Sequence, residues 1–73
     1  MGKRKVQLTN RVRECRFTAG GMTQQQLADL VGVTRQTVNA IESNKYSPSL
    51  EVAFLIARTL GVPIEDIFGI EER

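Results

Sequence analysis

The chain contains no histidine, and Cys15 is the one cysteine among its 73 residues. The side chains that most often bind zinc are therefore nearly absent, and no internal disulfide can form. Acid–base catalysis by histidine is excluded as well, and the sequence offers neither a nucleophile–base set nor a phosphate-binding loop. We predict that the protein is not an enzyme and uses no cofactor or metal ion. Cys15 lies three residues after Val12, and we interpret it as a core residue rather than a redox sensor.

Long hydrophobic runs are missing too. No apolar stretch reaches the length of a membrane span, and the N-terminus lacks the pattern of a signal peptide, so we predict a soluble cytoplasmic protein. The hydrophobic content of 41% suits one small core, and 73 residues leave no room for a second domain. No small-molecule ligand is evident from the sequence.

The net charge of +2 conceals an uneven distribution along the chain. Residues 1–16 hold six cations and one acid, which gives a balance of +5, and residues 17–60 are neutral. Residues 61–73 hold four acids and one arginine, which gives −3. One end is therefore expected to attract phosphate and the other to repel it, as suits a protein that lies on DNA with its acidic end turned away.

These shifts in charge suggest a division of the chain into three parts. We predict a basic flexible arm at 1–8, one folded domain at 9–69 and an acidic tail at 70–73. The arm is either a solvated terminus or a segment that follows a DNA backbone or enters a minor groove.

The most informative segment is 22–43, where two short amphipathic helices are joined by a turn of three residues. Thr23 and Gln26 have the spacing of a capping box, Gly32 ends the first helix, and Thr34 caps the second. The apolar stripe predicted for the first helix contains Leu27, Leu30 and Val31, with Ala28 beside it.

The second helix has an inward side with Val38 and Ile41 and an outward side that carries Arg35, Gln36 and Asn39. An arginine fork fits guanine O6 and N7, a carboxamide fits adenine N6 and N7, and small methyl groups fit a thymine methyl. A merely solvated face would normally carry glutamate and lysine instead. The predicted base-reading set is Arg35, Gln36, Thr37, Asn39 and Ala40.

The segment MTQQQLADLVGVTRQTVNAIES resembles the helix-turn-helix of the Xre/Cro family, the lambda-repressor-like domains. NRVRECR at 10–16 is similar to the first helix of that family, and SPSLEVAFLIARTLGVPIEDIF at 47–68 to its fourth and fifth helices. The resemblance implies an all-α fold of five helices, with the helix-turn-helix at the second and third. It also implies a DNA-binding transcription regulator of bacterial, archaeal or phage type that is associated with the nucleoid.

The remaining helices are predicted from periodicity and end signals. The first runs from about Asn10 to Ala19, the fourth from Ser47–Ser49 to Leu60, with Pro48 at its first position, and the fifth from Pro63 to Phe68. The inward residues of the first helix are Val12, Cys15 and Ala19. Those of the fourth are Leu50, Ala53, Phe54, Ala57 and Leu60.

The resemblance also implies further roles. In the family, the residue that matches Gln24 holds a phosphate and braces the recognition helix, and the residues that match Arg16 and Glu42 form a buried ion pair. The loop after the recognition helix grips the DNA backbone in relatives. The predicted backbone contacts are Gln24, Thr34, Ser43, Asn44, Lys45 and Tyr46.

A single module of this size makes too few contacts for useful specificity, so we expect a homodimer on a palindromic operator. A second apolar row on the fourth helix and apolar residues near the C-terminus suggest where the copies meet. Repression is the expected action, since a bound small domain acts most simply by occlusion. The predicted interface is Val52, Leu55, Ile67, Phe68 and Ile70.

Two alternatives to a transcription regulator stay open. The first is the DNA-binding antitoxin of a toxin–antitoxin pair, and the second is a helix-turn-helix module that binds proteins instead of DNA. A pure protein-interaction module would not need Arg35, Gln36 and Asn39 aligned on one face.

Overall fold

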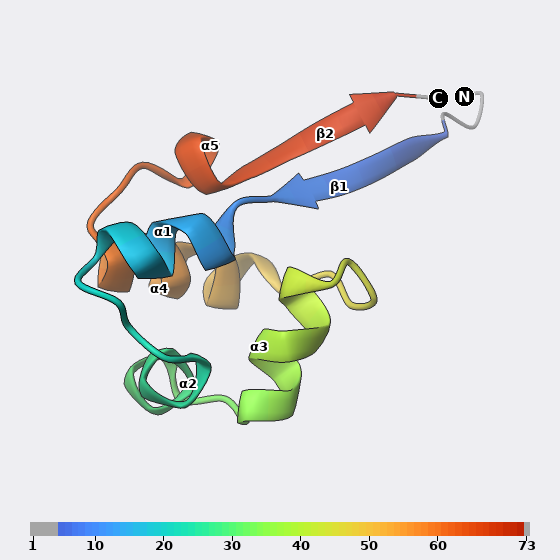
Figure 1. Ribbon diagram of the computed structural model, residues 1–73. Helices are drawn as coiled ribbons and strands as arrows, with labels where there is room; N and C mark the ends of the chain where they lie inside the picture. The colour runs from blue at the N-terminus through green and yellow to red at the C-terminus, as the bar shows by residue number, and fades with distance from the viewer. Residues whose placement is uncertain (1–4, 73) are drawn as a thin grey trace.

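The computed structural model describes residues 5–72 and contains five helices and a two-stranded antiparallel sheet (Figure 1). The prediction of five helices is confirmed, whereas the prediction of an all-α fold is wrong. Within residues 5–72, no helix is long and apolar enough to cross a membrane. The elements are β1 (Val6–Asn10), α1 (Val12–Thr18), α2 (Gln24–Val31), α3 (Arg35–Glu42), α4 (Leu50–Leu60), α5 (Ile64–Ile67) and β2 (Phe68–Glu72).

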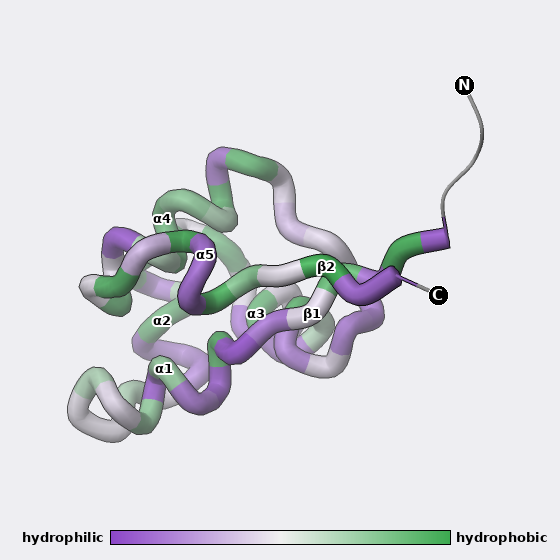
Figure 2. The backbone as a smooth tube through the Cα atoms, turned by 90° about the horizontal axis from the view of Figure 1, so that it is seen from above, coloured by the Kyte–Doolittle hydropathy of each residue, from purple (hydrophilic) through white to green (hydrophobic). Residues whose placement is uncertain are grey.

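The sheet joins the two ends of the described chain. β1 pairs with β2 so that Leu8 lies opposite Ile70 and Val6 lies opposite Glu72, and the two strands run side by side away from the helices (Figures 1 and 2). Side chains on a strand alternate between faces, so Val6, Leu8, Phe68 and Ile70 share one face of the ribbon.

This pairing corrects the predicted domain division. Residues 6–8 belong to β1 rather than to a flexible arm, and residues 70–72 belong to β2 rather than to a free tail. Residues 1–4 and 73 of the predicted arm and tail lie outside the described residues. Residues 6–10 of the basic segment lie beside residues 68–72 of the acidic segment, so the described parts of the two segments are neighbours and do not lie at opposite ends of the molecule.

The helices enclose one core. α4 contributes Ala53, Ile56, Ala57 and Leu60 to it, in the spacing i, i+3, i+4 and i+7. The predicted stripe is confirmed at Ala53, Ala57 and Leu60. It is wrong at Leu50 and Phe54, which are exposed, and it omitted Ile56, which is fully buried. Leu30 of α2 and Ala19 after α1 are exposed as well, against expectation. The buried apolar residues are Val12, Leu27, Ala28, Val31, Val38, Ile41, Ala53, Ile56, Ala57, Leu60 and Ile67. Cys15 is half-buried and packs against them.

The helix ends follow the predicted signals closely. The Thr23 hydroxyl accepts from the Gln26 N–H and the Gln26 side chain accepts from the Thr23 N–H, which completes the capping box. Gly32 ends α2 with φ 88°, a left-handed conformation that glycine adopts at least cost. Ser49 caps α4, so Pro48 precedes the cap instead of opening the helix.

Candidate nucleic-acid interface

The turn between α2 and α3 fixes the two helices against each other. The N–H groups of Gly32 and Val33 both donate to the Ala28 carbonyl, at 2.8 and 3.0 Å. Thr34 then caps α3 by accepting from the Thr37 N–H at 3.2 Å. Val38 and Ile41 are buried on the inner side of α3. α3 is therefore fixed against α2 from its first residue onward.

The outer side of α3 is open. Arg35, Gln36 and Asn39 are exposed, while Thr37 and Ala40 are half-buried beside them. The Thr37 hydroxyl lies 3.0 Å from the Thr34 hydroxyl, so it is engaged within the cap. A row of one guanidinium and two carboxamides thus faces solvent along the helix, as direct readout in a major groove requires.

The far end of α3 is tied to α1 by Arg16 and Glu42. Arg16 Nε donates to Glu42 Oε2 at 2.7 Å, and its Nη2 donates to Oε1 at 3.1 Å. Arg16 Nη1 donates to the Met22 carbonyl at 2.7 Å, just ahead of α2. The arrangement is a bidentate fork, the geometry in which arginine and carboxylate bind most specifically. The structure therefore contains the ion pair that the resemblance implies.

Gln24, the first residue of α2, extends this network to the exposed side of α3. Its Nε2 donates to Glu42 Oε1 at 3.1 Å and to Asn39 Oδ1 at 3.3 Å. A carboxylate only accepts hydrogen bonds, so the amide nitrogen of Gln24 must face Glu42. The same nitrogen then requires the oxygen of Asn39 toward it. Asn39 is left with its Nδ2, a donor, turned outward.

The predicted backbone-contacting residues divide into two groups. Thr34 and Ser43 are exposed but use their hydroxyls as caps; the Ser43 Oγ donates to the Asn39 carbonyl at 2.9 Å. Both N–H groups of the Gln24 carboxamide are also engaged internally. The loop after α3 is different, because the side chains of Lys45 and Tyr46 are exposed and make no hydrogen bond to any residue between 5 and 72.

Asn10 is a residue that the sequence analysis did not single out. Its Nδ2 donates to the Ile41 carbonyl and to Asn44 Oδ1, both at 2.9 Å, and its Oδ1 accepts from the Val12 N–H at 3.2 Å. Asn44 itself adopts a left-handed conformation with φ 60°. Asn10 therefore connects β1 and the start of α1 to the end of the recognition helix. The sequence shows only an asparagine two residues before a helix, a common local cap.

Arg13 and Phe17 were missed as well. Both are exposed on α1, and the Arg13 guanidinium lies 5.7 Å from the centre of the Phe17 ring. Together with Gln24, Asn39 and Ser43 they line a hollow beside α3. Arg13 makes no ion pair with any carboxylate among residues 5–72. The basic run at 11–16 was the available signal.

The residues predicted to form a dimer interface differ in their exposure. Ile67 is fully buried and offers no face to a partner, whereas Val52 is half-buried and packs against the core. Leu55 and Ile70 are exposed, and Phe68 is half-buried. No group of three or more metal-ligating side chains occurs within the part of the chain that the structure describes.

Known proteins are similar to this chain over the helical region described above. A family model described as "Helix-turn-helix" matches residues 12–67. A protein of Methanocaldococcus jannaschii named an uncharacterized HTH-type transcriptional regulator is 57% identical over 51 residues, which are 70% of this chain and 77% of that protein. An Archaeoglobus fulgidus protein of the same description is 48% identical over 61 residues, 84% of this chain and 86% of its own length. The regulator YgzD of Bacillus subtilis is 45% identical over 65 residues, 89% of this chain and 97% of YgzD.

Proposed function

This chain belongs to the helix-turn-helix family, of the Xre/Cro type, and is a DNA-binding regulator of transcription; from that premise we propose that it binds a palindromic operator as a homodimer and represses transcription by occlusion. The observation that carries the proposal is the open row of Arg35, Gln36 and Asn39 on a recognition helix anchored at both ends. A helix held in this way presents its side chains in one fixed register to the major groove.

Each member of the row has a preferred base edge. Arg35, at the start of α3, fits guanine O6 and N7 with its two-pronged fork, and Gln36 fits adenine N6 and N7. Asn39 is more restricted, because Gln24 occupies its oxygen and leaves the nitrogen as the outward donor. We therefore assign Asn39 to a base that presents an acceptor in the major groove. The methyl groups of Thr37 and Ala40 lie beside the row for contact with a thymine methyl.

Phosphate contacts would hold the two flanks of this helix. On one flank, the first free N–H groups of α2 attract an oxygen anion, with Gln24 oriented by Glu42 rather than free to donate. On the other flank, Lys45 and Tyr46 are exposed in the loop after α3. The preceding residue, Asn44, is held in place by a hydrogen bond from Asn10. Thr34 and Ser43 lie at the two ends of α3 and contribute mainly by capping it. Such contacts set the register and carry no sequence information.

Two copies are needed because one module buries only about 600–1,000 Å² on DNA. A two-fold dimer doubles the base contacts and reads half-sites whose centres lie one helical turn apart. A domain of this size that sits on a promoter acts most directly by excluding polymerase, which is why we propose repression.

Selection of sequences from a random DNA pool at physiological salt tests the proposal. The expected product is a palindrome with about 10 bp between half-site centres. A reporter driven by a promoter that overlaps the selected site should then lose expression when the protein is supplied. Enrichment of a single asymmetric half-site would contradict the homodimer, and a rise in reporter expression would contradict repression. A protein-interaction module would yield no enriched sequence at all.

A further inference from the structure

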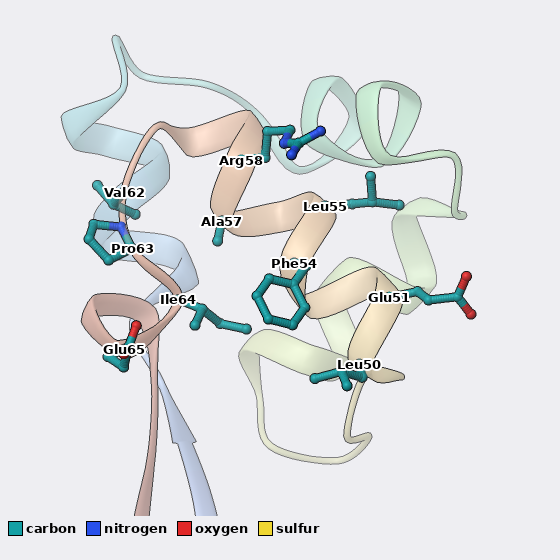
Figure 3. A pocket seen from close by; sticks show the side chains of 10 residues that line it. All are labelled: Leu50, Glu51, Phe54, Leu55, Ala57, Arg58, Val62, Pro63, Ile64 and Glu65. Atoms are coloured by element: carbon teal, nitrogen blue, oxygen red, sulfur yellow. The ribbon is translucent and has the colours of Figure 1, made fainter.

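The outer face of α4 is unusually apolar for a solvent-exposed helix. Leu50, Phe54 and Leu55 are 71%, 54% and 44% exposed, and Figure 2 shows α4 as a largely hydrophobic segment. Phe54 faces Ile64 across a groove of about 700 Å³ that α4 forms with the segment 62–65 (Figure 3). A contiguous exposed apolar surface of this kind usually marks an interaction site, whereas apolar residues scattered singly over a surface are ordinary.

Two unpaired charges flank this apolar row. Glu51 and Arg58 lie on the same helix, seven residues apart, which corresponds to two turns and about 10.5 Å along the axis. Neither side chain has an ion-pair partner among the residues that the structure describes. Both line the groove, with Phe54 and Leu55 between them.

We propose that a second copy of this chain docks on this face, with the two α4 helices antiparallel about a two-fold axis that passes near Phe54 and Leu55. This inference rests on the proposed homodimer and names the surface through which it forms. In an antiparallel pair, Glu51 of each copy faces Arg58 of the other, and the apolar rows cover each other. A two-fold interface requires this property. If Glu51 of the first copy contacts Arg58 of the second, then Arg58 of the first copy must contact Glu51 of the second.

The charge pattern selects a second copy over an unrelated partner. A partner face of one sign would satisfy one end of the row and repel the other, whereas the same face in reverse order satisfies both. The apolar surface also continues past α4: Leu50 and Ile64 line a second hollow together with Leu8 and Phe68 of the ribbon. This continuity matters because a stable interface takes about 800 Å² from each partner, and an 11-residue helix alone offers too little.

The surface is compatible with DNA binding. None of the groove residues belongs to the base-reading row, so a pair joined through α4 leaves both recognition helices open. The two-stranded ribbon gains as well, since an isolated pair of strands is marginally stable in water.

Charge reversal on the full chain tests the docking mode. Molecular masses are measured by sedimentation, free and on the selected operator, for the wild type, Glu51→Arg, Arg58→Glu and the double variant. Each single reversal places like charges opposite one another and should raise the dimer dissociation constant by roughly tenfold or more. The double variant restores both pairs in reversed order and should dimerise like the wild type. A mixture of the two single variants should form heterodimers.

A second exposed apolar residue supplies the control. Phe54→Lys should produce a monomer, whereas Leu30→Lys, at a still more exposed position on α2, should leave the mass unchanged. Circular dichroism verifies that each variant is folded. A wild-type dimer that persists in both single reversals and in Phe54→Lys overturns the α4 surface while the homodimer stands. A wild type that is monomeric both free and on an asymmetric selected site overturns the homodimer together with this surface.

Discussion

Arg16 and Glu42 hold the end of the recognition helix against α1 through two hydrogen bonds, of 2.7 and 3.1 Å. Their side chains are 8% and 7% exposed, so water supplies little of their solvation. A charge in such a place is tolerated only with its partner present. The pair therefore sets the orientation of α3 at the end opposite to the Thr34 cap.

Glu42→Gln should destabilise the fold strongly. The substitution keeps the shape of the side chain but leaves the buried Arg16 guanidinium without a countercharge, at a cost of about 3–5 kcal/mol. Urea unfolding followed by circular dichroism measures the loss. Glu14→Gln is the control, because Glu14 and Arg11 are exposed and 4.0 Å apart, and such pairs contribute about 1 kcal/mol at most. Equal losses in the two variants would contradict the structural role of Glu42.

Gln24→Ala should relax base preference at the position that Asn39 is proposed to read. Without the Gln24 amide, the Asn39 oxygen is released and its side chain can present either end to DNA. Asn39→Ala should remove about 1–3 kcal/mol of discrimination at that base pair. The double variant should add little to the single ones, since the two residues act through one bond.

The control for this pair is Gln25→Ala. Gln25 is the next residue of α2 and donates to Asp29 on the exposed side of the helix. Its removal should leave the selected sequence unchanged. If Gln24→Ala and Asn39→Ala altered different base pairs, the orientation of Asn39 by Gln24 would be ruled out.

Much of the helical framework was predictable because its signals are local. A capping box, a cap threonine and an end glycine each act within four residues, and Thr23, Gln26, Gly32 and Thr34 do what their spacing predicts. The ribbon was not, because β1 and β2 lie at opposite ends of the sequence. A run of five residues with weak alternation does not reveal a partner at that distance.

The prediction for α4 was wrong at Leu50 and Phe54 for a different reason. Eight of its 11 residues are apolar, so periodicity alone does not distinguish the buried face from the exposed one. The structure buries small Ala53 and Ala57 and exposes large Leu50 and Phe54. What the pattern could not supply was the position of the neighbouring helices.

The open face of α3 could be predicted from sequence, but its internal order could not. Arg35, Gln36 and Asn39 are outward as their spacing indicates. The direction of the Asn39 amide depends on Gln24, 15 residues away. Asn10 likewise acts on Ile41 and Asn44 across the fold. Such contacts become visible only once the helices are assembled.

Arg35→Ala and Lys45→Ala should weaken DNA binding in different ways. Arg35 is proposed to read a base, so its loss should relax the preference at one position in each half-site. Lys45 is proposed to contact phosphate, so its loss should weaken all sequences about equally and lower the salt slope by roughly one. The affinities of each variant for the selected operator and for an operator with one base changed, measured over a range of salt concentrations, distinguish the two effects. A loss of sequence preference in Lys45→Ala would contradict this division.

Arg13→Gln should behave like the loss of a phosphate contact. The Arg13 guanidinium rests on the Phe17 ring beside Gln24 and Asn39, and no carboxylate among residues 5–72 neutralises it. A phosphate that approaches the start of α2 lies within reach of this charge. The slope of log affinity against log salt should therefore fall by roughly one, with the selected sequence unchanged. Arg11→Gln is the matched control. Arg11 lies two residues before Arg13, at the start of α1, and already has Glu14 as a neighbouring countercharge. The salt slope of Arg11→Gln should change less than that of Arg13→Gln. If Arg13→Gln and the wild type had equal salt slopes, the hollow lined by Arg13 and Phe17 would not contact DNA.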